Sequence, residues 1–231
     1  MFPLRDNVPS RSFPVVTVLL ILVNTAVFIY EVSLGSGGLT RFVSQNALVP
    51  GHVTAYFSGG APAGPLNLLP FFTSMFLHGG WVHLIGNMWF LWIFGDNVED
   101  RLGHVRYLVF YILCGLIGNV AHYALNPASA LPALGASGAI AGVLGAYVLS
   151  YPGARILVLL PIFFFIQFVE LPALVVLGFW FVLQFLNGAA SVVASGEAGG
   201  VAWWAHIGGF LGGMLIFNLF RPRPRVWYER R

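Results

Sequence analysis

The stretch "ALGASGAIAGV", residues 133–143, contains one hydroxyl, that of Ser137, among small uncharged residues. Gly138 and Gly142 are four positions apart, so on a helix they share one face and let a neighbouring backbone approach closely. A serine in such a helix has two interpretations. It is either a packing residue bonded to its own backbone or a nucleophile, and the surrounding sequence has to decide between them.

The composition is that of a membrane protein. Of 231 residues, 58% are hydrophobic and only 8% are charged, and the mean hydropathy is +0.83. An average soluble domain has about 25% charged residues. Ten-residue segments of alternating hydrophobicity, typical of membrane β-barrels, are missing from the sequence. We therefore predict an all-α polytopic protein with a single membrane domain over residues 1–231.

Six segments are apolar enough to be predicted as membrane spans. They are residues 14–31, 81–95, 105–123, 137–151, 171–187 and 203–220. The first resembles a signal peptide, but it is long for one and further spans follow, so we expect it to be retained.

The arginines indicate the orientation of these spans. If the N-terminal segment 1–13 is cytoplasmic, ten of the eleven arginines lie inside and only Arg41 lies outside, as short cytoplasmic loops prefer. The basic tail, residues 221–231, has two interpretations, a nucleic-acid contact or a cytoplasmic anchor, and its position after a span favours the anchor. We expect a bacterial inner-membrane protein with both ends in the cytoplasm and no nucleic-acid partner.

Two apolar segments are too broken by proline to span. Residues 32–80 form a long outer loop, which we expect to lie in the interface or partly re-enter the bilayer. Residues 155–172 contain Pro161 and Pro172. We expect the first part of that segment to lie at the cytoplasmic interface and the fifth span to begin near Pro172.

The fourth span is short. From Ser137 to the break at Tyr151 it has 15 residues, or about 22 Å, less than the ~30 Å of hydrocarbon. Its outer end should therefore start below the membrane surface. Irregular backbone at that depth must be buried in protein or face water, so the loop before Ser137 predicts a cavity open to the outside.

Polar side chains occupy the outer ends of three spans that all run inward. His83 and Asn87 share a face of the second span, Ser137 starts the fourth, and His206 is early in the sixth. Gly209 and Gly213 give the sixth span its own close-packing motif. We expect these four polar groups to converge at one depth.

Together these groups suggest serine hydrolase chemistry. Ser137 would be the nucleophile and His206 the general base and acid. The Ser137 backbone N–H, His83 and Asn87 would bind the oxyanion. No acidic residue occupies the outer half of the three spans that carry these groups, so a dyad is favoured over a triad. We expect neither a metal nor a cofactor, and the lone Cys114 excludes a disulfide within the chain.

Other polar residues have less specific interpretations. We expect His78 to be a fold residue, the charged turn after the second span, with Glu99 and Arg101, to cap helices, and Asn119 and His122 to bond to the loop before Ser137. The glycine-rich loop "ASGEAGG", residues 194–200, lies before His206 and suits a gate.

The segments "GASGAIAG" with Ser137, "AHIGGFLGG" with His206 and "HGGWVHLIGNMWFLWIFG" with His83 and Asn87 resemble the signatures of rhomboid intramembrane serine proteases. The resemblance implies a six-helix core, a Ser137–His206 dyad, oxyanion binding around His83 and Asn87, and cleavage of transmembrane segments without a cofactor. The expected partners are transmembrane protein substrates and the lipid bilayer.

The sequence departs from the family in two places. Residues 32–80 contain no Trp, where some members carry a Trp-Arg pair. Ala141 stands where some members have a Tyr that stacks under the catalytic histidine, which leaves open how His206 is held. The alternative function is a catalytically silent rhomboid-like protein that binds transmembrane helices. A small transporter is less favoured because the halves show no internal symmetry.

Overall fold

The structure is a computed structural model that describes residues 1–60, 65–162, 165–193 and 201–221. The glycine-rich loop 194–200 and residues 222–231 of the basic tail, to which the sequence assigned a gate and an anchor, lie outside the described residues. The helices are α1 (Val15–Ser33), α2 (Gly35–Asn46), α3 (Pro50–Phe57), α4 (Pro70–Thr73), α5 (Trp81–Leu102), α6 (His104–Leu125), α7 (Ser137–Ser150), α8 (Ala173–Val193) and α9 (Trp203–Phe220), with short 3₁₀ turns at Pro65–Leu68 and Ser74–Phe76.

Six of these helices, α1 and α5 to α9, overlap the six predicted spans, but α5 continues seven residues and α8 six residues beyond the predicted ends. Within the described residues, α1, α6, α8 and α9 are each long and apolar enough to cross a membrane. The helix α7 has 14 residues and is shorter than a span, as the sequence predicted. The mostly helical, polytopic fold is confirmed, whereas the crossing of the bilayer by α5 and α7 stays a prediction.

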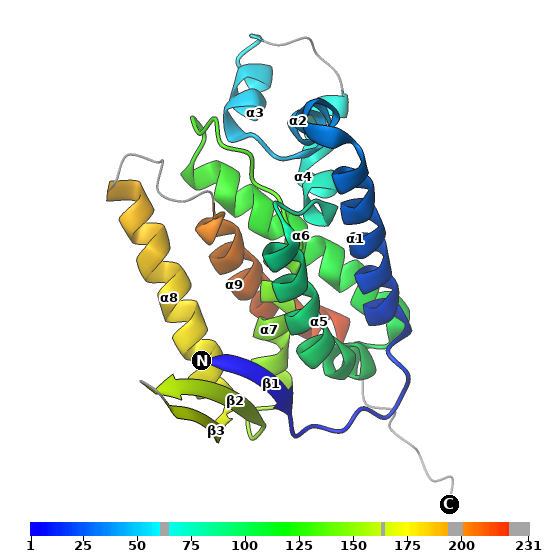
Figure 1. The fold of residues 1–231 in the computed structure, drawn as a ribbon, viewed down its shortest axis with the longest axis vertical. Coiled ribbons are helices and arrows are strands. Elements are labelled where there is room, and N and C mark those ends of the chain that lie inside the picture. Colours follow the sequence, from blue (N-terminus) through cyan, green and yellow to red (C-terminus); the bar gives the residue numbers. More distant parts are fainter. Residues whose placement is uncertain (61–64, 163–164, 194–200, 222–231) are drawn as a thin grey trace, which may run out of the picture.

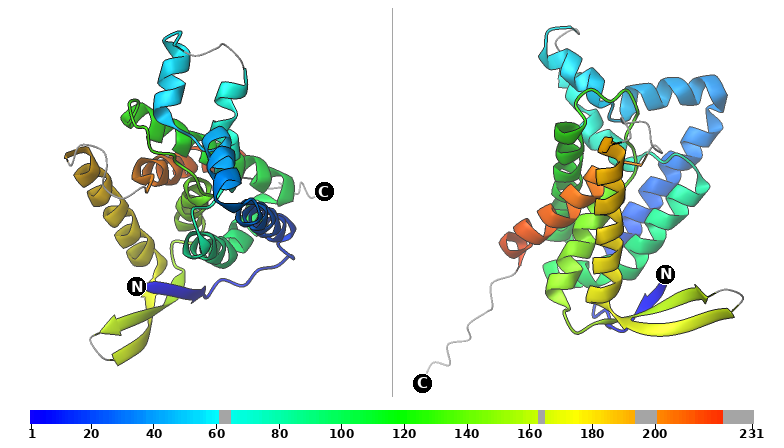
Figure 2. Two further views of the ribbon diagram at one scale, coloured as in Figure 1. Left: turned by 45° about the horizontal axis from the view of Figure 1, so that its top comes forward. Right: turned by 90° about the vertical axis from the view of Figure 1, so that its left-hand side faces the viewer.

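The short helix α7 is the centre of the bundle. Every residue from Gly138 to Tyr147 is buried, and α7 packs against α5, α6 and α9 (Figure 1). The helix α8 stands at the outside of the bundle in both Figure 1 and Figure 2.

Glycines bring the three inner helices together. A Cβ at Gly209 would overlap the carbonyl oxygen of Gly138, and one at Gly213 would overlap that of Gly142. A Cβ at Gly118, on α6, would lie 2.6 Å from the carbonyl oxygen of Ala205. The close approach predicted from the two four-residue glycine spacings is therefore confirmed, because only a residue without a side chain fits at these crossings.

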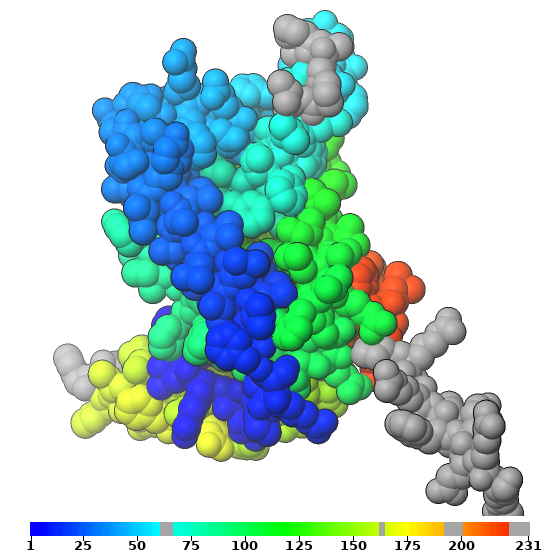
Figure 3. All heavy atoms as spheres, turned by 90° about the vertical axis from the view of Figure 1, so that its right-hand side faces the viewer, coloured from blue at the N-terminus to red at the C-terminus, as the bar shows by residue number. Residues whose placement is uncertain are grey.

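A small antiparallel sheet, which the sequence analysis did not predict, covers one end of the bundle. Its strands are β1 (Phe2–Asp6), β2 (Arg155–Ile162) and β3 (Phe165–Pro172), in the order β1-β2-β3. In the hairpin Arg155 pairs with Pro172 and Val158 with Val169. Figure 3 shows the N-terminal segment and the hairpin side by side at this end.

The segment 155–172 is therefore a hairpin, and its buried side chains explain why. Ile156 and Val158 are fully buried against the bundle, while Phe165 and Phe168 are exposed. Ile and Val favour strands, and Pro161 rules out a helix through this segment. The helix α8 begins at Ala173, directly after Pro172, close to its predicted start.

Residues 96–101, predicted as a charged turn after the second span, are the last turns of α5, and Glu99 there has the structural role that the sequence predicted for it. Its buried carboxylate accepts hydrogen bonds from the backbone N–H groups of Val16 (2.9 Å) and Thr17 (2.8 Å), at the first turn of α1. It also accepts one from the Thr17 hydroxyl and lies 2.5 Å from His104 Nδ1. A negative charge at a helix N-terminus satisfies free N–H groups and the helix dipole, so Glu99 fixes α1 to α5.

The long outer segment between α1 and α5 folds over the loop that precedes α7. Leu48 and Ala133 form a two-way backbone bridge, with N···O distances of 3.0 and 2.7 Å. The Ser74 carbonyl accepts a hydrogen bond from the N–H of Gly135. The approach of the chain to Ser137 is thus held by residues some 60 to 85 positions earlier.

Candidate active site

Ser137 is the first residue of α7, and Gly135 sets the turn before it. Gly135 has φ +125°, a conformation that favours glycine. Because Ser137 starts the helix, its backbone N–H has no acceptor within α7. The Ser137 hydroxyl and the Ser137 backbone N–H therefore lie together at the start of α7.

His206, in the first turn of α9, contacts Ser137. Its Nε2 lies 2.6 Å from Ser137 Oγ, and the residue is 9% exposed. The glycine crossings of α7 with α9 described above bring the two backbones close enough for this contact. The structure therefore joins two side chains that the sequence analysis paired across 69 residues.

The other ring nitrogen of His206 has a partner that the sequence analysis missed. Its Nδ1 lies 2.7 Å from Oε1 of Gln184, on α8, and both side chains are buried. The rings of Trp180 and Trp203 flank the imidazole at centroid distances of 6.0 and 6.2 Å. These contacts answer how His206 is held when Ala141, buried inside α7, offers no ring beneath it.

A signal for Gln184 was present in the sequence. It is an amide within the predicted span 171–187, three residues before its end, where an unpaired amide is costly. A carboxylate is the usual group that orients a catalytic histidine, but the neutral amide oxygen of Gln184 can accept the same hydrogen bond. No spacing rule connects residues 184 and 206, which lie on different helices.

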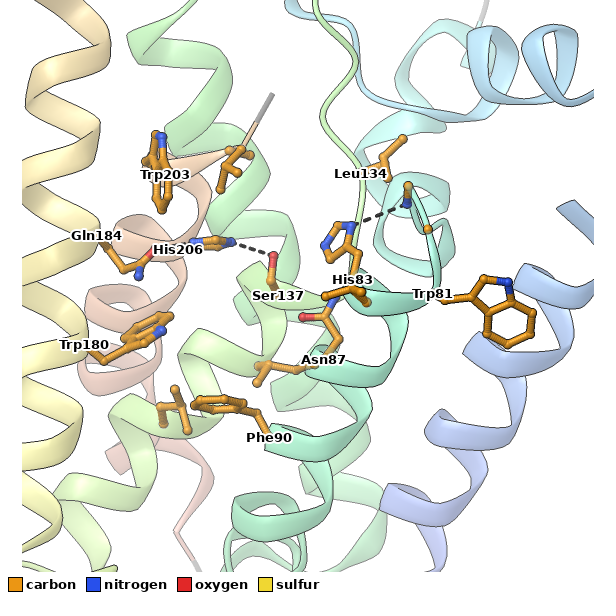
Figure 4. Close-up of a pocket in the computed structure, with 18 residues that line it drawn as sticks. Trp81, His83, Asn87, Phe90, Leu134, Ser137, Trp180, Gln184, Trp203 and His206 are labelled. Atoms are coloured by element: carbon orange, nitrogen blue, oxygen red, sulfur yellow. Dashed lines mark hydrogen bonds between the residues drawn. The ribbon is translucent and has the colours of Figure 1, made fainter. Parts of the chain in front are cut away.

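His83 and Asn87, on α5, face Ser137 from the opposite side (Figure 4). The Gly79 N–H donates to His83 Nδ1 at 3.4 Å, so a neutral His83 carries its proton on Nε2. The Asn87 amide nitrogen is buried and has no hydrogen-bond partner among the described residues. The His83 Nε2–H and the Asn87 amide are thus two donors near Ser137 that form no hydrogen bond among the described residues.

These groups line one cavity of about 750 Å³ between α5 and α8. Ser137, His206, His83 and Asn87 all contribute to it, as do Gln184 and residues of the turn before α5. Its deeper wall is apolar, formed by Phe90, Ile140, Leu144 and Trp180. The cavity has the volume of a ligand-binding site with a few convergent polar groups.

Other polar residues lie around this cavity. The His78 ring is buried and contacts the His83 ring edge to face, at 5.2 Å between centroids. The Asn119 amide donates to Phe71 O and Ser74 Oγ, so it reaches the loop before Ser137 only through Ser74. His122 shows no bond to that loop, and its Nδ1 has no partner in the part of the chain that the structure describes. Across the described ranges no three His, Cys, Asp or Glu side chains group as metal ligands would.

The fold and the cavity define a class of helical membrane protein. In this class a serine and a histidine, on two tightly packed helices, are in contact inside a cavity of the bundle. A profile described as "Rhomboid domain" matches residues 65–223. The chain belongs to the rhomboid family.

Known relatives match between about a third and 85% of this chain. The mouse "Presenilin-associated rhomboid-like protein, mitochondrial" is 28% identical over 85% of the chain and 54% of its own length. The "Putative rhomboid protease YdcA" of Bacillus subtilis (strain 168) is 32% identical over 64% of the chain and 69% of its length. The "Rhomboid protease GluP" of the same organism is 42% identical over 32% of the chain and 14% of its length. The chain thus spans about half the length of the mitochondrial relative.

Proposed function

We propose that this protein is an intramembrane serine endopeptidase with a Ser137–His206 dyad. The observation that carries the proposal is the 2.6 Å contact between His206 Nε2 and Ser137 Oγ in a lined cavity. This distance is within the range expected of a nucleophile and its general base. The family includes proteins named as proteases, YdcA and GluP among them, which is consistent with the proposal.

The chemistry follows from where each group lies. His206 Nε2 takes the Ser137 proton as Oγ attacks the scissile carbonyl, and the new bond places negative charge on the carbonyl oxygen. The Ser137 N–H, His83 Nε2–H and Asn87 amide donate to that oxygen. His206 then protonates the leaving amine as the C–N bond breaks. A water molecule, deprotonated by His206, hydrolyses the acyl-enzyme and restores Ser137.

We propose a membrane-embedded substrate on the basis of the cavity walls. Phe90, Leu144 and Trp180 give the deep side an apolar surface that suits side chains of a transmembrane segment. A regular helix keeps its backbone carbonyls bonded and shielded, so substrates should carry small or helix-breaking residues near the cut. The cavity opens toward the face we propose to be extracytoplasmic in the inner membrane of a bacterium, with both chain ends in the cytoplasm.

The alternative is a silent rhomboid-like protein that binds transmembrane helices. Such a protein needs the cavity but not the dyad, the unused Asn87 donor or the His83 tautomer. The presence of all of these groups in one cavity favours the enzyme.

The test is cleavage of a transmembrane reporter by the purified protein in liposomes. Ser137→Ala and His206→Ala should each abolish product, while Ser150→Ala, at the other end of α7, and His52→Ala, on an exposed turn of α3, should cleave like the parent. Labelling of the parent, but not of Ser137→Ala, by a fluorophosphonate would support the nucleophile without knowledge of the substrate. Cleavage by Ser137→Ala at the parent rate rejects the dyad.

A further inference from the structure

We infer that Gln184 is a positioning residue that selects the reactive tautomer of His206, an inference that rests on the proposed dyad. The contact joins Gln184 Oε1 to His206 Nδ1 at 2.7 Å, and both residues are buried, at 8% and 9% exposed. It lies opposite the Nε2 contact with Ser137. The imidazole is therefore held at both nitrogens in one line across α7, α9 and α8, which Figure 4 shows.

The two nitrogens of a neutral imidazole have different requirements. For Nε2 to accept the Ser137 proton, it must carry the lone pair, and the proton must be on Nδ1. A buried Nδ1–H without an acceptor gives up its bond to water and gains none in return, which disfavours that tautomer. Gln184 Oε1 supplies the acceptor, so it stabilises the tautomer that activates Ser137 and disfavours the one that does not.

The surroundings of His206 leave this role to Gln184. The described side chains around the imidazole are His83 on α5, His122 on α6, Ser137 on α7 and the rings of Trp180 and Trp203, and none of them places an acceptor at Nδ1. Ala141 has no polar group. The indole rings restrict where the imidazole plane can lie, but they cannot choose which nitrogen holds the proton.

Through this contact, α8 contributes a residue that orients His206. This helix lies at the outside of the bundle, and its exposed side chains include Leu174, Phe179 and Phe185. Trp180 and Gln184, four residues apart, share the face that lines the cavity. Any displacement of α8 that separates Gln184 from His206 therefore removes the tautomer preference while leaving the Ser137–His206 pair in place.

The decisive experiment compares Gln184→Met with Gln184→Glu. Methionine keeps the length of the side chain and removes the acceptor, whereas glutamate keeps an oxygen at the same position. We expect Gln184→Met to lower kcat at least tenfold with KM changed less than twofold, and Gln184→Glu to retain kcat within about threefold of the parent. Gln45→Met, on the exposed α2, is the matched control.

A spectroscopic readout separates this inference from the proposed function. In ¹⁵N-histidine NMR spectra, with His206→Ala identifying the signal, the parent should show His206 protonated at Nδ1, and Gln184→Met should shift it toward the Nε2–H form. That shift would support the positioning role even if no substrate were cleaved. An unchanged tautomer in Gln184→Met, or an unchanged kcat with an active parent, overturns it.

Discussion

Gly135 passes so close to His83 that a Cβ at position 135 would lie 2.7 Å from His83 Nε2 and 3.5 Å from the Asn87 amide nitrogen. The backbone there also has φ +125°. The turn before Ser137 therefore packs directly against His83 and Asn87, the two side chains that we assign to the oxyanion site.

Gly135→Ala should reduce cleavage by a factor of about 100, the loss typical when an oxyanion donor is displaced. The added methyl group strains the turn and pushes His83 away from Ser137. Initial rates of reporter cleavage measure the effect, with Gly153→Ala as the control because its Cβ position is open and its φ is ordinary. Equal rates for parent and Gly135→Ala would contradict this placement of His83.

Gly209→Ala should destabilise the protein by about 2 kcal/mol. Its Cβ would overlap the carbonyl oxygen of Gly138, which belongs to a helix backbone and cannot turn away. Thermal unfolding in detergent measures the loss, and Gly178→Ala, where nothing lies within 4 Å, should unfold like the parent. If the unfolding temperature fell in both variants, or in neither, the result would argue against the close crossing of α7 and α9.

Glu99→Gln should lower the free energy of unfolding by about 2 kcal/mol, because hydrogen bonds to a buried charge are worth about 1.5–3 kcal/mol each and the amide group turns one acceptor into a donor. The lost contacts are those to the first turn of α1. Denaturant unfolding measures the change. Glu170→Gln is the control, since the Glu170 side chain is 58% exposed and its contact with Arg155 is 3.7 Å long.

Asp6 should make stability depend on pH at the sheet-covered end. Burial raises the pKa of its carboxyl to about 6, against the opposing effect of the hydrogen bond from Tyr147, while Asp96 repels its charge. The folded protein therefore holds this proton more tightly than the unfolded chain. Stability should be greatest below about pH 4, fall as the pH rises toward 6, and then level off.

Asp6→Asn tests this dependence. The variant cannot ionise, so its unfolding midpoint should change less than that of the parent between pH 4 and pH 7. A parent that gains stability as the pH rises through this window would reverse the sign and refute the assignment.

The proposed orientation predicts two accessible sides. In a Cys114→Ala background, Gly37→Cys on α2 should react with an impermeant maleimide added outside intact cells, and Gly153→Cys should react only after the cells are opened. Both glycines are exposed and have open space at their Cβ positions. The opposite pattern would place the cavity on the cytoplasmic side.

The sequence alone determined the six helices of the bundle and the family, but not the shorter helices α2, α3 and α4, which lie in the segment predicted as a loop. Hydropathy and length are local properties, so the bounds of α1, α6 and α9 followed from the apolar runs within a few residues. The shortness of α7 and the glycine spacings at Gly138 and Gly209 also predicted how deep Ser137 lies and how close α9 comes. His206 was expected at Ser137 because these features act together.

Only the tertiary structure decided which distant partners complete these elements. The hairpin 155–172 becomes part of a three-stranded sheet because β1, about 150 residues earlier, pairs with β2, and hydropathy does not report strand pairing. Gln184 meets His206 because α8 is rotated toward the cavity, and α8 has too few polar residues to fix its rotation from sequence. The reason is common to both: an apolar run shows that a segment is buried or in lipid, whereas contacts between elements depend on packing that no local pattern encodes.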